Sequence, residues 1–228
     1  SKARVAPPSV YAKLALAVVL VSTSGPFLVM AHMNAYAVAF WRMAASGLLF
    51  LAWAWLTRAR RGADQRLTRA HVRPLVVGAL CLAAHFCLWI KAFDLTDYAS
   101  NHLLLVMQPV IAAFLGIRLG EHPTRRTWWS LLISVAGLVI IARGDFALGP
   151  RALAGDLLCI LGDLAIASFY LVARVPRAEL PLSLFMGVTL TVGALPVLAL
   201  VGGAGVSLLA YPARSFAWLG GIVVLSTL

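Results

Sequence analysis

Residues 85–121 read HFCLWIKAFDLTDYASNHLLLVMQPVIAAFLGIRLGE, two apolar runs joined by the short acidic break FDLTDYAS. Each run is long enough for a membrane helix once the residues before it are counted, because a spanning helix needs about 20 apolar residues. The break contains Asp94 and Asp97 and no arginine. Arginines follow the second run, at Arg118, Arg125 and Arg126. The stretch therefore predicts a transmembrane hairpin with its acidic turn on one side of the bilayer and its basic ends on the other.

The composition of the whole chain places it in the same class. Of its 228 residues 62% are hydrophobic and only 12% are charged, whereas a soluble domain has roughly 25% charged residues. The net charge of +11 comes from Arg and Lys residues between the apolar runs. The positive-inside rule explains that placement, so no nucleic-acid partner is expected. Cys81, Cys87 and Cys159 lie inside apolar runs without a CxxC pair, so we expect no metal site, no disulfide framework and no cofactor.

Hydropathy predicts an all-α polytopic membrane protein. A basic segment precedes the first apolar run, which begins near residue 14. No signal-peptide cleavage site follows that run, so it is interpreted as a first membrane helix. Seven spanning helices are expected, and an eighth apolar run begins near Phe216. Their approximate bounds are 14–31, 35–56, 74–93, 99–119, 127–142, 152–173 and 182–201, with a tight turn at 32–34.

Arginine placement also predicts the orientation. The N-terminus, the basic loop 57–73 and the arginines at 118–126 and 174–177 fall on one side of the membrane. That side is expected to be cytoplasmic, and the acidic turn 94–97 is expected outside.

The chain contains an internal repeat. FWRMAASGLLFLAW in the second helix aligns with FMGVTLTVGALPVLA in the seventh, matching Gly47 to Gly193. Five helices separate equivalent positions, and because five is odd the second copy enters the membrane inverted. Inverted repeats are typical of transporters, with the substrate site near the midplane. We expect a first five-helix unit over 1–142 and an incomplete second unit over 143–228. A ten-helix plan would then extend beyond Leu228, with about seven and a half helices present here.

Several landmarks of the hairpin resemble helices three and four of the EamA-type transporters, in the drug/metabolite transporter superfamily. They are Trp89, Ala99, Ser100, Pro109 and the Leu119-Gly120-Glu121 close, continued by Trp128 and Gly137. The resemblance implies the ten-helix plan and export of small organic metabolites (amino-acid, nucleobase or drug-like) across a bacterial inner membrane. Membrane lipid is then an expected partner, and a homodimer is an open alternative.

Arg42 lies near mid-membrane in the second helix, where an ionisable side chain costs about 2.5–3.5 kcal/mol on insertion scales. The family often has an arginine here. One interpretation is a clamp for a substrate carboxylate, which suits the forked guanidinium donors. The alternative is a structural ion pair with Asp163. Asp163 is too deep in its helix for a capping role, so it is a candidate proton carrier or the partner of Arg42, whereas Asp156 is interpreted as a helix cap.

The fourth helix has one polar stripe, made by Asn101, His102, Leu105, Gln108 and Pro109. Such a stripe predicts cavity-lining, substrate-binding side chains, with interhelical hydrogen bonding as the alternative. Pro109 is also expected to bend this helix.

Four further residues have predicted roles. His85 and Trp89, one turn apart in the third helix, are predicted to bind substrate, while packing or proton coupling stays open for His85. Gly120 and Glu121 are given structural roles, with Glu121 paired to Arg125 or Arg126.

The favoured function is a secondary transporter working by alternating access. An intramembrane enzyme using His85, His102, Asp156 and Asp163 is one alternative, but these residues match no HExxH, GxSxG or paired-carboxylate spacing, so no enzymatic activity is expected. A non-transporting scaffold is the other alternative. Buried Arg42 and Asp163 count against it, because a scaffold has no need of ionisable side chains that are costly inside a membrane.

Overall fold

The computed structural model describes residues 7–58 and 66–227, and only the backbone of residues 8 and 141–148. All regular secondary structure in the described residues is helical. The elements are α1 Pro8–Ser22, α2 Ser24–Ala31, α3 Ala35–Leu56, α4 Arg69–Ala92, α5 Tyr98–Leu104, α6 Met107–Arg118, α7 Arg125–Leu148, α8 Pro150–Val172, α9 Arg174–Glu179, α10 Leu182–Gly203 and α11 Ala213–Ser226.

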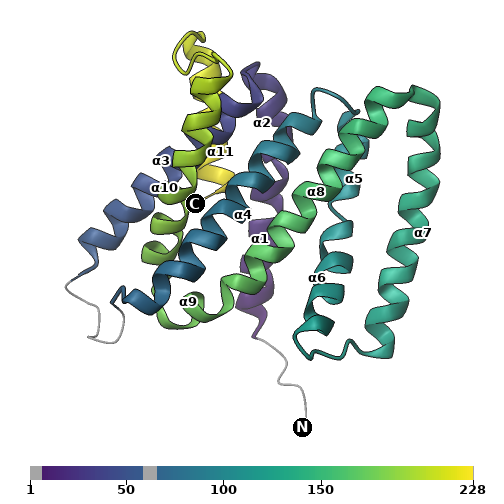
Figure 1. Cartoon of the computed structure of the whole chain (residues 1–228), viewed down its shortest axis with the longest axis horizontal. Coiled ribbons are helices and arrows are strands. Elements are labelled where there is room, and N and C mark those ends of the chain that lie inside the picture. The colour runs from purple at the N-terminus through teal and green to yellow at the C-terminus, as the bar shows by residue number, and fades with distance from the viewer. Residues whose placement is uncertain (1–6, 59–65, 228) are drawn as a thin grey trace.

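Six stretches within the described residues are long and apolar enough to cross a membrane. They are Ser9–Ala31, Ala35–Leu56, Arg69–Ala92, Tyr98–Arg118, Pro150–Val172 and Leu182–Gly203. α7 is a helix of 24 residues, and α11 is a shorter apolar helix of 14 residues. The long helices run up and down the molecule in alternation (Figure 1). The prediction of an all-α polytopic membrane protein is therefore confirmed.

The acidic turn between α4 and α5 lies at the opposite end of the bundle from the connection between α6 and α7 (Figure 1). Lys91 Nζ donates to Asp94 Oδ2 over 2.7 Å, and Asp97 caps α5 by accepting from the backbone N–H groups of Ala99 and Ser100. Such a cap satisfies N–H groups that have no partner inside the helix. The short acidic break thus ends one helix and starts the next.

Two of the predicted helices are interrupted, each three or four residues before a proline. The first predicted helix is divided into α1 and α2 at Thr23, and the fourth into α5 and α6 at Leu105–Val106. Proline lacks an N–H, and its ring clashes with the carbonyl four residues earlier in a helix. In a regular helix the rings of Pro26 and Pro109 would clash with the carbonyls of Ser22 and Leu105. The break near Pro109 agrees with the expected bend, whereas the break near Pro26 was not predicted, although Ser9–Ala31 remains one candidate membrane span.

The tight turn 32–34 is present as expected. His32 has φ +48° at the end of α2, and Asn34 caps α3 by accepting from the Tyr36 N–H over 3.0 Å. α4 begins five residues before the predicted Pro74. Its first turn is held by His71, whose Nδ1 accepts from the Thr68 N–H over 3.1 Å.

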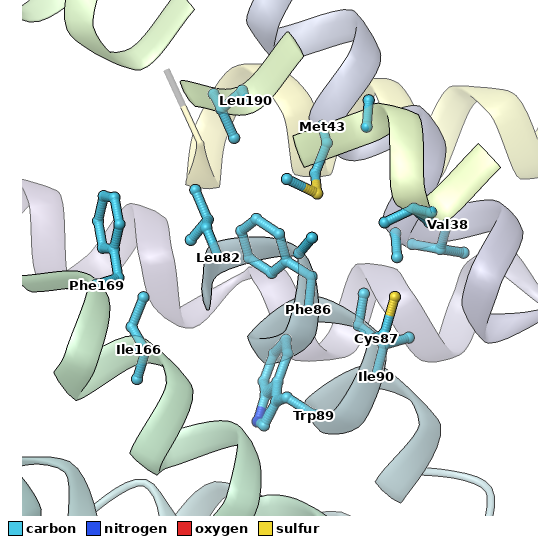
Figure 2. Close-up of a cluster of buried hydrophobic side chains, with 14 of the residues drawn as sticks. Val38, Met43, Leu82, Phe86, Cys87, Trp89, Ile90, Ile166, Phe169 and Leu190 are labelled. Carbon is cyan, nitrogen blue, oxygen red and sulfur yellow. The ribbon is translucent and has the colours of Figure 1, made fainter. Parts of the chain in front are cut away.

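The core lies where α3, α4, α8 and α10 meet (Figure 2). Met43 of α3, Phe86 and Ile90 of α4, Phe169 of α8 and Leu190 of α10 are all buried there. The absence of a side chain at selected glycines lets these helices approach closely. A Cβ on Gly47 would lie 2.8 Å from the Thr191 backbone nitrogen, and one on Gly193 would lie 2.8 Å from the Ala79 carbonyl oxygen.

Candidate functional site

A cavity of about 480 Å³ lies inside the bundle. Side chains from α1, α2, α3, α4, α5, α6, α8, α10 and α11 line it. Five residues singled out from the sequence are among them: Arg42, His85, Trp89, His102 and Gln108. The volume falls within the range of about 300–1,000 Å³ that is typical of small-molecule sites. The consecutive helices α3, α4, α5 and α6 thus bring the predicted residues to one space.

Arg42 is 6% exposed, and every hydrogen-bond partner of its guanidinium is neutral. Nε donates to Thr227 Oγ1 over 2.9 Å, Nη1 to Ser24 Oγ over 3.1 Å and Nη2 to the Ser226 carbonyl over 3.5 Å. The guanidinium carbon lies 4.5 Å from the centroid of the Phe86 ring, at cation–π distance. The ion pair with Asp163 that the sequence left open is not formed. Among the described residues Arg42 has no carboxylate within salt-bridge distance.

Asp163 lies behind the cavity wall and is hydrogen-bonded to the cavity-lining Gln108. Its side chain is completely buried, and Oδ1 accepts from Gln108 Nε2 over 3.0 Å. Oδ2 has no hydrogen-bond partner among the described residues. Gln108 therefore separates the Asp163 carboxyl group from the cavity and is in contact with both.

An aromatic wall forms another side of the cavity. His85 Nδ1–H donates to the Gly162 carbonyl over 2.9 Å, and its ring stacks on Trp89 at 6.1 Å between centroids with an interplanar angle of 12°. Trp89 meets His102 edge-on at 5.9 Å, and His102 stacks on Tyr98 at 4.3 Å. Figure 2 shows Trp89 and Phe86 on the same helix among the core side chains. These rings present flat apolar surface next to the Arg42 charge.

Asn101 does not line the cavity, although the sequence placed it there. It is completely buried, and its Nδ2 donates to the Trp89 carbonyl over 3.3 Å. This contact corresponds to the alternative of hydrogen bonding between helices. Leu105 of the same stripe does line the cavity.

Asp156 is not the helix cap that the sequence suggested. α8 begins at Pro150, so Asp156 lies in the second turn rather than the first. Its Oδ1 accepts from Thr96 Oγ1 over 2.8 Å, which joins α8 to the connection between α4 and α5.

The Leu119-Gly120-Glu121 close ends α6 in a Schellman motif. Gly120 has φ +84°, its N–H donates to the Ile117 carbonyl, and the Glu121 N–H donates to the Gly116 carbonyl. This pattern satisfies carbonyls at the helix end and favours glycine at the left-handed position. The Glu121 carboxylate pairs with Arg174 of α9, so the expected pairing with Arg125 or Arg126 is wrong. The hydrogen bond from Arg174 lowers the pKa of the exposed Glu121 carboxyl below its ordinary value.

Ser24, Phe86 and Thr227 contact Arg42 and were not predicted as site residues. The Ser24-Gly25-Pro26 sequence inside an apolar run was the one available signal, because proline interrupts the helix beside Ser24. Within the described residues, no group of three His, Cys, Asp or Glu side chains could hold a metal ion.

Comparisons with known proteins identify the family. A model described as "EamA-like transporter family" matches residues 9–143, more than half of the chain. A solved structure described as "Crystal structure of protein" has the same fold, with a TM-score of 0.65 at 17% sequence identity. That alignment covers 92% of this chain and 73% of the other. The comparison with curated proteins gave no match. The resemblance noted from the hairpin is thereby confirmed, and this chain belongs to the EamA-like transporter family.

Proposed function

We propose that this protein is a secondary transporter that moves small organic metabolites out of the cell by alternating access. The observation that supports this best is the cavity inside the bundle of apolar helices, lined by Arg42, His85, Trp89, His102 and Gln108. Ionisable and polar groups are costly inside a membrane, and they mark substrate pathways where they face a cavity. We assign substrate contact to these five residues, and assign Asn101 to packing between helices.

The proposed mechanism uses two inverted five-helix units, 1–142 and the part of a second one within 143–228. α3 and α10 pack closely at Gly47 and Gly193, the glycines that the sequence repeat aligns. α1 and α8, the first helices of the two units, run in opposite directions (Figure 1). These features support a rocking motion of one unit against the other about the α3–α10 contact. Asp163 is the candidate proton carrier, because it is a buried carboxyl group hydrogen-bonded to the cavity-lining Gln108.

The proposed location is a bacterial plasma membrane, with the N-terminus and the α3–α4 and α6–α7 connections in the cytoplasm. The support is the arginine bias between the two ends of the bundle. The partners are a small-molecule substrate and membrane lipid, with a homodimer as an open alternative.

Transport is tested with the protein in proteoliposomes preloaded with labelled amino acids, nucleobases or drug-like amphiphiles. We expect release of at least one class, and a severalfold lower rate with Arg42→Gln. Arg214→Gln changes an exposed arginine at the start of α11 and should leave the rate unchanged. Chemical conversion of a metabolite without release would favour the intramembrane enzyme. Absence of both release and conversion would favour the scaffold.

A further inference from the structure

The cavity has basic groups on its wall and no acidic side chain. The ionisable residues among its described lining are Arg42, His85, His102 and Tyr170, and none of the lining residues is Asp or Glu. The Asp163 carboxyl group, which is hydrogen-bonded to the cavity-lining Gln108, is completely buried. A cationic group in the cavity would therefore meet Arg42 without a carboxylate to balance it.

Arg42 has unused capacity to bind an anion. A guanidinium has five N–H donors, and three of its bonds go to neutral partners, Thr227, Ser24 and the Ser226 carbonyl. Buried charges in proteins are normally paired, because an isolated charge in a low-dielectric interior is costly. No described carboxylate supplies that pairing. An anionic ligand would supply it, and a carboxylate matches the forked geometry of the remaining donors.

The surroundings of Arg42 limit what can be attached to that anionic group. Phe86 covers one side of the guanidinium, and Trp89 continues an aromatic surface along α4 towards His102. The buried indole N–H of Trp89 has no hydrogen-bond partner among the described residues. A flat apolar group fits this wall, since stacked and edge-on aromatic contacts are favourable at these separations.

Resting on the transport function proposed above, we propose that the substrate is a small organic anion, with a carboxylate or similar acidic group on Arg42 and a planar apolar group against Trp89. The cavity would then bind such anions in preference to cations and to neutral molecules of the same shape. Its described lining offers N–H donors and lacks acidic acceptors, so specificity follows from charge more than from size.

The test uses three probes with the same ring and different charge: phenylacetate, phenylacetamide and phenethylamine. Binding of each radiolabelled probe is measured by equilibrium dialysis at neutral pH against the protein in nanodiscs, with empty nanodiscs correcting for partition into lipid. We expect phenylacetate to bind at least about tenfold more tightly than either other probe, a difference of about 1.4 kcal/mol. Equal or tighter binding of phenethylamine, or no binding of any probe, would overturn the proposal.

Variants assign the preference to Arg42. Arg42→Gln should abolish the preference for phenylacetate and leave phenylacetamide binding unchanged, whereas Arg42→Lys should retain part of it because it keeps the charge and loses the fork. The exposed Arg214→Gln is the matched control and should bind like wild type. A preference retained in Arg42→Gln would overturn the assignment. If Arg42→Gln fails to fold, the three-probe comparison on wild type still decides.

The two proposals can fail separately. Metabolite release from proteoliposomes without an anion preference would refute the substrate class and leave transport standing. An anion preference without any release would refute transport and leave the ligand class standing.

Discussion

Gln108 occupies a position between two environments, the cavity on one side and a buried carboxyl group on the other. It is the one described hydrogen-bond partner of Asp163 oxygens, through Nε2 and Oδ1 at 3.0 Å. A change at Gln108 therefore acts on substrate contact and on the solvation of Asp163 together. This dual role makes Gln108 the residue where binding and stability are most closely linked.

We predict that Gln108→Leu lowers the free energy of unfolding by about 1–3 kcal/mol, because it leaves the Asp163 carboxyl group buried without a partner. Gln108→Leu/Asp163→Leu should recover much of that loss, since replacing both partners by apolar groups can be nearly neutral. Chemical denaturation in detergent micelles measures the wild type, Gln108→Leu, Asp163→Leu and the double variant.

Thr191→Val is the control for this comparison. The Thr191 hydroxyl is also buried without a hydrogen-bond partner in the described part of the chain, so its removal should cost little. A double variant as unstable as the sum of the two single changes would show that the Gln108–Asp163 contact does not couple them.

The sequence identified the basic and amide side chains that line the cavity, but neither their partners nor the hydroxyl groups of the lining. Arg42, His85 and Gln108 could be found because charged and polar side chains are rare in apolar helices. The contacts of Arg42 come from Ser24 and Thr227, far away in the chain, and helical periodicity contains no information about such pairs. Asn101 was misplaced because one helical wheel was applied across the break at Leu105, where the regular spacing does not continue.

At the scale of the helices, prolines show why element bounds were only partly predictable. Pro26 and Pro109 lie next to helix breaks, whereas Pro74 and Pro196 lie inside the continuous helices α4 and α10. The missing N–H is the same in all four. Whether a helix continues past proline depends on how neighbouring helices accommodate the freed carbonyl, which is a property of the packed bundle.

The contact between α3 and α10 depends on a glycine that tolerates no side chain. We predict that Gly47→Ala destabilises the protein by about 1–3 kcal/mol, the usual cost of overpacking, because the added Cβ would meet the Thr191 backbone nitrogen at 2.8 Å. Thermal unfolding in detergent micelles measures the effect.

Gly137→Ala is the matched control, since Gly137 also lies inside a helix, α7, and nothing lies within 4 Å of its added Cβ. Alanine there should be neutral or stabilising by up to about 1 kcal/mol through helix propensity. Similar melting temperatures for the two variants would contradict close packing of α3 on α10.

For the whole molecule, one ion pair and one hydrogen-bonding contact at the basic end of the bundle connect parts of the chain that the repeat assigns to different units. Glu121 at the end of α6 pairs with Arg174, and His71 at the start of α4 lies 2.8 Å from Glu179. Both partners are at the ends of the short helix α9. The exposed Glu121–Arg174 pair contributes little stability, whereas His71 is buried where it meets Glu179. Through these two contacts α9 joins the end of α6 to the start of α4.

The orientation of the bundle in the membrane follows from the same charge distribution and is the most direct prediction to check. Gly62, near the middle of the basic loop 57–73, lies outside the described residues, so the exposed Arg66 of the same loop is used as the cytoplasmic position. Ala204 is exposed and caps the C-terminal end of α10, and the connection from α10 to α11 lies at the other end of the bundle (Figure 1). In a background with Cys81, Cys87 and Cys159 changed to alanine, Ala204→Cys should react with a membrane-impermeant maleimide in intact cells. Arg66→Cys should react only after permeabilisation, because arginine-rich connections stay in the cytoplasm. The reverse labelling pattern would invert the topology and contradict the orientation derived from the arginine bias.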